Sequence, residues 1–127
     1  RRQRQMCIRD SYMFVGILIN KAVPGYFYRM DKNGVMSDGS ACGNDTASER
    51  SMVSKYFVDS VLYWAKEYHI DGFRFDLVGL IDIDTINKIR EELDKIRPNI
   101  MMYGEGWTLN TKLTKKDVLL ATQKNII

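Results

Sequence analysis

The spacing of apolar residues along this chain predicts helices and strands in alternation. Between about residues 46 and 68 the apolar positions recur at spacings of four, four and three, which places them along one face of a helix. These positions are Val53, Phe57, Val61 and Trp64. Thr46 and Glu49 have the spacing of a capping box, so the sequence predicts that this helix begins there.

A short segment with strand periodicity follows at residues 72–77. Phe73 and Phe75 alternate with Arg74 and Asp76, so one face of the predicted strand is aromatic and the other is charged. Arg74 and Asp76 share the charged face and lie close enough to form a hydrogen-bonded ion pair. This pair would hold the Asp76 side chain in its ionised form.

A second helix and a second strand are predicted next. The helix begins near Asp82 or Asp84, whose side chains suit an N-cap, and ends before Pro98. Its buried face consists of Ile86, Ile89, Leu93 and Ile96. Residues 100–103 are typical of a short buried strand, and residues 115–125 of a further helix.

The loop upstream of the first helix is long. Residues 26–44 are rich in glycine and polar residues, and residues 31–34 have the composition of a turn. Loops of this length in a compact domain are usually functional.

The predicted strands and the helix between them have the order of a βαβ unit with a carboxylate after each strand. Asp76 ends the first strand, and Glu105 follows the second between Gly104 and Gly106. Glycine at these two positions lets a ligand or another backbone approach closely. The sequence therefore predicts an α/β fold, and helices alternating with strands that end in acids are the arrangement of a (β/α)₈ TIM barrel active site.

Composition and charge limit the classes of partner. The chain has 127 residues and a formal net charge of +3, but residues 1–10 contribute all of that charge, because the remainder holds equal numbers of basic and acidic residues. We therefore expect no nucleic-acid partner. The apolar run at residues 12–19 is much shorter than the ~20 residues that a membrane span needs, so we expect no membrane partner either. A cytoplasmic and a secreted location both remain open.

Two carboxylates at neighbouring strand ends suit the chemistry of a retaining glycosidase. Such enzymes need their two carboxyl groups ~5 Å apart, and adjacent parallel strands are ~4.8 Å apart. Asp76, beside Arg74, suits the nucleophile, and Glu105, beside Trp107 and away from obvious cations, suits the acid/base. Trp107 is either a core aromatic or a platform on which a sugar stacks.

The alternative is that both acids merely cap strand ends in another α/β protein, such as a nucleotide-binding domain. The chain has no Gly-x-Gly-x-x-Gly sequence and no Walker-type loop, which weakens that alternative. No spacing typical of metal ligands is present, so we predict no metal and no cofactor.

These motifs resemble those of glycoside hydrolase family 13, the α-amylase family. Residues 71–77 are similar to its nucleophile motif, and residues 104–107 to its acid/base motif in the form found in type I pullulanases. Residues 23–29, 42–50 and 68–71 are similar to the same subgroup.

The resemblance implies a fold, a reaction and a site. The chain would be a partial (β/α)₈ barrel, about strands 4 and 5 with flanking helices, and its parent would hydrolyse α-1,6-glucosidic linkages of pullulan, starch or glycogen by a retaining mechanism. Asp76 and Glu105 would be catalytic, and Arg74 and Trp107 would bind substrate. The alternatives are another α-amylase-family glucanase or isoamylase, or a non-catalytic carbohydrate-binding relative.

The chain divides into three segments on this interpretation. Residues 1–11 resemble one reading frame of a sequencing-library adapter and would be non-native, although a signal peptide is an alternative interpretation of the N-terminus. Residues 12–20 are of uncertain origin, and residues 21–127 would be part of the catalytic domain. Because the family's third catalytic acid would lie beyond Ile127, we expect the isolated chain to be inactive and poorly folded.

Overall fold

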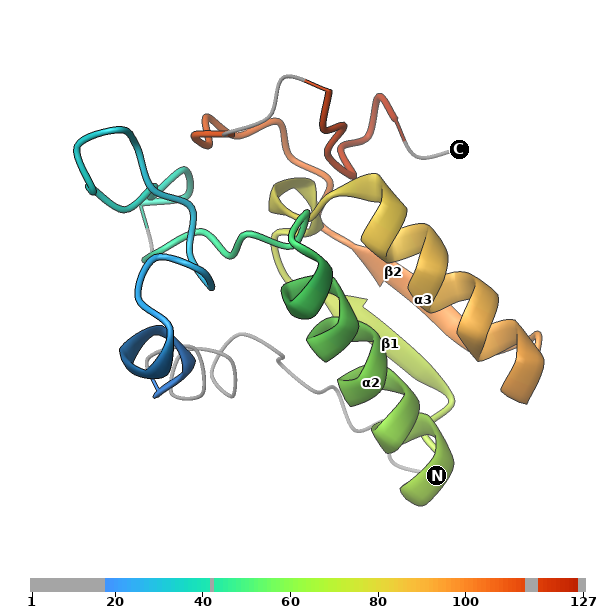
Figure 1. The fold of residues 1–127 in the computed structure, drawn as a ribbon. Helices are drawn as coiled ribbons and strands as arrows, with labels where there is room; N and C mark the ends of the chain where they lie inside the picture. The colour runs from blue at the N-terminus through green and yellow to red at the C-terminus, as the bar shows by residue number, and fades with distance from the viewer. Residues whose placement is uncertain (1–17, 42, 114–116, 126–127) are drawn as a thin grey trace.

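The computed structural model describes residues 18–41, 43–113 and 117–125. Its elements are α2 (Ser51–Glu67), β1 (Gly72–Phe75), the short 3₁₀ helix η1 (Val78–Leu80), α3 (Ile83–Ile96) and β2 (Met101–Gly104) (Figure 1). Residues 18–22 are also helical. The predicted order of helix, strand, helix and strand is confirmed. The segment interpreted as adapter, residues 1–11, lies outside the described residues.

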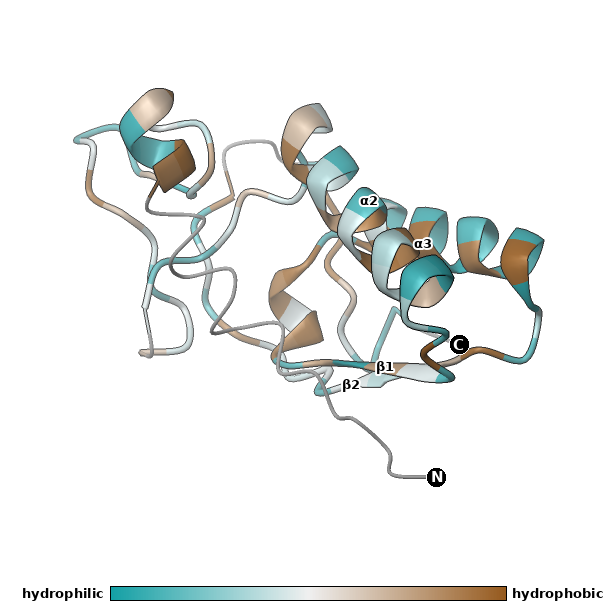
Figure 2. Ribbon diagram, turned by 90° about the horizontal axis from the view of Figure 1, so that it is seen from below, coloured by the Kyte–Doolittle hydropathy of each residue, from teal (hydrophilic) through white to brown (hydrophobic). Residues whose placement is uncertain are grey.

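The two strands form a parallel pair joined by α3. Gly72 of β1 is in register with Met101 of β2, and the pairing runs to Phe75 and Gly104. Helices α2 and α3 pack against each other and cover the same face of the sheet (Figures 1 and 2). In the described residues the sheet has these two strands only. The predicted βαβ unit and the α/β class are confirmed.

The core lies between the helices and the sheet. Phe73 and Phe75 point into it from β1, each with 2% of its surface exposed, while Arg74 between them is half-buried. The helices contribute Val53, Phe57, Val61, Ile89 and Leu93. Complete burial of one such side chain contributes about 1.5–3 kcal/mol, so this aromatic face decides which side of β1 turns toward the helices. The predicted two-faced strand is confirmed.

The two helix starts differ from each other in their capping. Asp82 caps α3, because its Oδ1 accepts a hydrogen bond from the Thr85 backbone N–H at 2.9 Å, as predicted. The capping box predicted for α2 is wrong, since that helix begins at Ser51 without a side-chain cap. Thr46 instead pairs with Tyr28 in an isolated bridge, and the Glu49 carboxylate binds Arg29. Residues distant in sequence therefore bind both Thr46 and Glu49, so neither residue caps α2.

Two further predictions are corrected on the C-terminal side. The strand predicted at residues 100–103 is not buried along its length: Ile100 is buried, but Met101 and Tyr103 are more than half exposed. The helix predicted at residues 115–125 is absent from residues 117–125, its described part. The Leu119 carbonyl accepts from the Ile83 N–H and the Ala121 N–H donates to the Ile81 carbonyl, so these backbone groups are not available to a helix.

The predicted loop at residues 26–44 contains the predicted turn. The Gly34 N–H donates to the Asp31 carbonyl at 3.0 Å, and the Asp31 carboxylate accepts from the backbone N–H groups of Asn33 and Val35, each at 2.9 Å. Lys112 donates to the other carboxylate oxygen of Asp31 at 3.0 Å. The hydrogen bond from Val35 is the largest cause that lowers the pKa of Asp31, followed by the one from Lys112.

We predict that Asp82→Ala lowers the free energy of unfolding by about 1 kcal/mol, because the first turn of α3 loses its cap. Asp82→Asn should cost less, since an asparagine oxygen can accept the same hydrogen bond. Asp84→Ala is the control: Asp84 is an exposed acid in the same first turn. Urea unfolding of the full-length protein that contains this segment measures all three, and equal effects of Asp82→Ala and Asp84→Ala would contradict the assignment of the cap.

The Asp31 turn gives a prediction about pH. Because the folded state lowers the pKa of Asp31, its contribution to stability is present at neutral pH and is lost as the pH falls through that lowered pKa. In Lys112→Met we expect the pKa to remain below its ordinary value, since the Val35 N–H is the larger cause. NMR titration of the Asp31 carboxyl group tests this, and a return to the ordinary value in Lys112→Met would contradict it.

Candidate active site

The two predicted acids lie side by side at one edge of the sheet. Asp76 and Glu105 directly follow Phe75 and Gly104, which are the last residues in register, so they continue the same ladder. The Glu105 N–H donates to the Phe75 carbonyl at 3.3 Å. Both side chains are partly exposed, to 18% for Asp76 and 35% for Glu105. The parallel register thus brings together two carboxylates that are far apart in sequence.

Arg74 connects these two carboxylates. Its Nη1 lies 3.6 Å from Oδ1 of Asp76, which confirms the predicted ion pair but is longer than the predicted hydrogen bond, and its Nη2 makes a closer, hydrogen-bonded contact with Oε1 of Glu105. The prediction that Glu105 lies away from cations is wrong. Arg74 and Tyr103 are in register, so a guanidinium on β1 readily reaches an acid just beyond β2. One guanidinium therefore contacts both acids. Its positive charge alone does not determine which acid is the nucleophile and which is the acid/base.

The chain turns sharply after Asp76. Leu77 has a left-handed backbone with φ 51°, and it leads directly into η1. Gly79 in η1 packs on the segment after β2: its N–H donates to the Glu105 carbonyl at 3.3 Å, and a Cβ atom there would lie 2.0 Å from the Trp107 carbonyl oxygen. Only glycine permits this approach. The loops that follow the two acids are consequently in direct backbone contact.

Gly104 fulfils the predicted role for glycine beside Glu105. A Cβ atom on Gly104 would lie 2.5 Å from the Phe75 carbonyl oxygen, so glycine allows another backbone to approach closely. The Trp107 side chain is 59% exposed, beside this contact. Trp107, two residues after Glu105, is therefore exposed, as a stacking platform would require.

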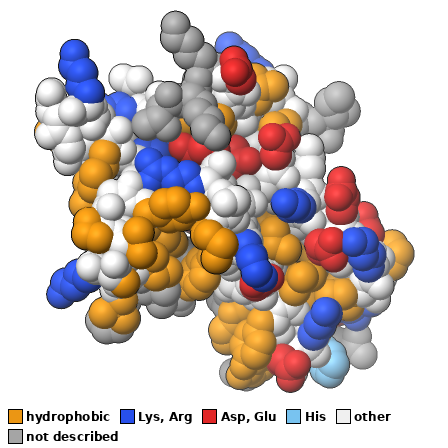
Figure 3. All heavy atoms as spheres, viewed as in Figure 1, with side chains coloured by type: hydrophobic (Ala, Val, Ile, Leu, Met, Phe, Trp, Pro, Cys, Tyr) orange, Lys and Arg blue, Asp and Glu red, His pale blue; other side chains and the backbone are white. Residues whose placement is uncertain are grey.

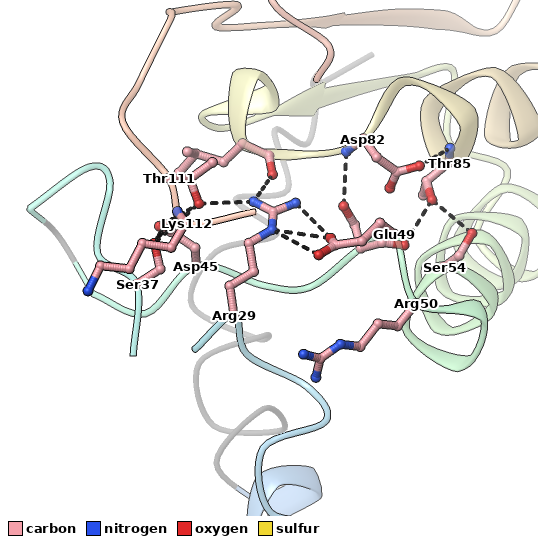
Figure 4. A network of polar contacts seen from close by, with 12 residues as sticks. Arg29, Ser37, Asp45, Glu49, Arg50, Ser54, Asp82, Thr85, Thr111 and Lys112 are labelled. Atoms are coloured by element: carbon pink, nitrogen blue, oxygen red, sulfur yellow. Dashed lines mark hydrogen bonds and ion pairs between the residues drawn. The ribbon is translucent and has the colours of Figure 1, made fainter. Parts of the chain in front are cut away.

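A buried polar network adjoins the acids, and the sequence did not predict it. Arg29 is completely buried and donates from Nε and Nη2 to the Glu49 carboxylate, at 2.9 Å for the shortest contact (Figure 4). Its Nη1 donates to the Leu80 carbonyl at 2.7 Å and to Thr111 Oγ1 at 3.2 Å. This guanidinium therefore joins the loop before α2 to both loops that follow the acids.

The network extends to a second buried carboxylate. Asp45 accepts hydrogen bonds from the Ser37 hydroxyl at 2.7 Å and the Thr111 hydroxyl at 2.6 Å, and from the Gly39 N–H. Ser37 in turn accepts from the Lys112 N–H at 2.8 Å. Asp45 and Glu49 lie in residues 42–50, one of the segments that resemble the family. The sequence feature that could have indicated this network is a charged residue, Arg29, directly after three aromatic residues.

The described residues contain neither a candidate metal cluster nor a candidate membrane span. No group of three or more His, Cys, Asp or Glu residues there could hold a metal ion. In the same part of the chain no helix is both long and apolar enough to cross a membrane. Acidic and basic side chains are interspersed on the face shown in Figure 3. What the site offers is a pair of carboxylates around a cation, beside an exposed indole.

The chain is similar in sequence to pullulanases over most of its length. No protein-family model matches it. The pullulanase of Bacillus subtilis (strain 168) is 53% identical over 93 residues, which cover 73% of this chain and 13% of that protein. Pullulanase 1, chloroplastic, of Arabidopsis thaliana is 37% identical over 117 residues, which cover 86% of this chain and 12% of that protein. The chain thus spans only about an eighth of the length of these curated relatives.

A solved structure gives the same result. The crystal structure of the pullulanase from Paenibacillus barengoltzii in complex with maltohexaose and α-cyclodextrin matches with a TM-score of 0.79 and 52% sequence identity. The match covers 84% of this chain and 16% of that one. At this identity the two chains are similar in both fold and sequence.

The contact between the loops at Gly79 leads to a prediction. Gly79→Ala should lower the free energy of unfolding by about 1–3 kcal/mol or more, because the methyl group would overlap the Trp107 backbone, which cannot move without displacing the loop. Gly34→Ala is the matched control: it also adds one methyl group, but in open space and on a strained backbone with φ 78°. A smaller loss for Gly79→Ala than for Gly34→Ala, measured by urea unfolding of the full-length protein that contains this segment, would contradict the loop contact.

Proposed function

The chain is a homologue of one segment of the pullulanases, and from this relationship we propose that it is part of an enzyme that hydrolyses α-1,6-glucosidic linkages. The substrates would be pullulan, starch or glycogen. The observation that carries the proposal is the pair of acids around Arg74 at the ends of adjacent parallel strands, in a segment 53% identical to a pullulanase. The maltohexaose and α-cyclodextrin bound to the solved relative support an α-glucan as substrate.

We propose that residues 21–127 are part of a (β/α)₈ barrel of glycoside hydrolase family 13, with β1 and β2 as its fourth and fifth strands. Supporting this, the described strands are parallel, joined by a helix and covered by helices on one face, as barrel strands are. The charged face of β1 would then point into the barrel. Residues 1–11 would be adapter-derived.

In the proposed mechanism Asp76 is the nucleophile and Glu105 the acid/base; these roles rest on the family resemblance, since Arg74 contacts both acids. The Asp76 carboxylate attacks the anomeric carbon, and Glu105 as general acid transfers its proton to the glycosidic oxygen, so that the leaving chain departs as an alcohol. Glu105, now a carboxylate, then takes a proton from a water molecule that attacks the same carbon and releases Asp76. Two inversions give net retention at the anomeric carbon.

Arg74 and Trp107 support this chemistry in different ways. The Arg74 guanidinium contacts both acids, so it would orient the two carboxyl groups and fix the distance between them. The exposed Trp107 indole would stack against a glucose ring. Both residues would therefore bind and orient, while the two acids carry out bond breaking and proton transfer.

The proposal is tested with the full-length protein that contains this segment. We expect release of reducing ends from pullulan and little from linear amylose. Asp76→Asn and Glu105→Gln should each lower kcat by roughly 10²–10⁴-fold or more, because they remove the nucleophile and the proton donor. By the family resemblance, the 127-residue chain alone should show no activity.

Asp71→Asn is the matched control, since Asp71 is an exposed acid at the opposite end of β1, paired with Arg97 at 2.9 Å. Its activity should stay close to that of the unmodified protein. Hydrolysis of amylose but not of pullulan would agree with the proposed family and would contradict the proposed α-1,6 specificity. Unchanged activity in Asp76→Asn or Glu105→Gln would overturn the assigned roles.

A further inference from the structure

One buried nitrogen atom links the two loops that carry the acids. Nη1 of Arg29 donates to the carbonyl of Leu80, in the turn after Asp76, and to the hydroxyl of Thr111, in the segment after Glu105. We infer that Arg29 is a positioning residue that fixes the separation of the two carboxylates; this inference rests on the proposed function. Arg29 itself contacts neither acid, so it would act through the backbone of both loops.

The guanidinium is well suited to hold a fixed geometry. Arg29 and Glu49 have side chains that are 0% and 4% exposed, and the Glu49 carboxylate receives Nε and Nη2 of the fork. This contact leaves Nη1 directed at Leu80 and Thr111. A planar group fixed along one edge cannot rotate, so its third nitrogen stays at a set position.

The paths from Arg29 to the acids are short. On the first path, the Leu80 N–H donates to the Leu77 carbonyl at 2.9 Å, which closes the turn directly after Asp76. On the second path, Thr111 is also bound to Asp45, which anchors the segment that follows Glu105. Gly79, the neighbour of Leu80, also donates its N–H to the Glu105 carbonyl at 3.3 Å, so we expect a shift of these anchors to alter the position of one acid relative to the other.

Stability alone is a weak reason for such a pair. Replacing a buried ion pair by apolar residues of similar volume is often neutral or stabilising, because both charges must lose their hydration. The Arg29–Glu49 pair lies where the loops that follow the two acids come together. Directional hydrogen bonds from its guanidinium can fix the separation of the acids, which apolar packing would not do. Misplacement of reacting groups by ~1 Å can lower a rate about 10²-fold.

The test compares four variants of the full-length protein at a temperature well below each unfolding midpoint. Arg29→Lys keeps the charge and loses the fork, and Thr111→Val removes one anchoring hydroxyl that Thr111→Ser restores. Arg50→Lys is the matched control, because Arg50 adjoins Glu49 but donates to the carbonyl groups of Gly25 and Tyr26 instead of the acid-bearing loops.

Two measurements are made on each variant: kcat and KM on pullulan, and hydrogen exchange of the Gly79 and Glu105 amides. We expect Arg29→Lys and Thr111→Val to lower kcat about 10–100-fold with little change in KM, and to speed exchange at both amides. Thr111→Ser should recover most of the kcat lost in Thr111→Val, and Arg50→Lys should change neither measurement.

The two readouts separate this inference from the proposed function. If kcat falls only in proportion to the folded fraction, or exchange is unchanged in Arg29→Lys and Thr111→Val, Arg29 has no positioning role. Exchange needs no substrate, so it decides whether Arg29 holds the loops even if the unmodified protein hydrolyses neither pullulan nor amylose. That last result would overturn the proposed function, and with it the catalytic purpose of the positioning.

Discussion

The parallel register of β1 and β2 determines where the side chains of the candidate site lie. Phe73 and Phe75 must face the helices, and because side chains alternate along a strand, Arg74 and Asp76 must face the other way. A slip of one residue would bury the guanidinium and the carboxylate and expose both aromatic rings. The apolar core thus selects the register, and the register in turn places Asp76 next to Glu105.

Beyond the strand ends, polar contacts add to the apolar packing of residues such as Phe27, Val78 and Ile81. The loops after the acids meet at Gly79 and are bound to the upstream loop through Arg29, Glu49 and Asp45. Such a network destabilises the fold if any member lacks a partner, because a buried polar group without a hydrogen bond costs about 1–3 kcal/mol of folding free energy. It is correspondingly specific, because directional hydrogen bonds permit only one arrangement of the three loops.

Local signals in the sequence identified the helices and their faces, the Asp82 cap and the turn at residues 31–34. The same kind of signal failed at Thr46 and Glu49, where a sound capping box was overruled by a bridge to Tyr28 and by the buried Arg29. It failed again at residues 117–125, whose backbone pairs with the segment before α3. In each case a distant partner offered the backbone or the carboxylate a better hydrogen bond than the local helix did.

The candidate site divides in the same way. The sequence by itself determined the βαβ order, the aromatic face of β1 and the carboxylate at the end of each strand, because these follow from residue spacing along one chain. Only the tertiary structure decided that Arg74 reaches Glu105 as well as Asp76, and that Arg29 joins both loops. Those contacts depend on distances between segments far apart in sequence, and such distances are set by packing and not by periodicity.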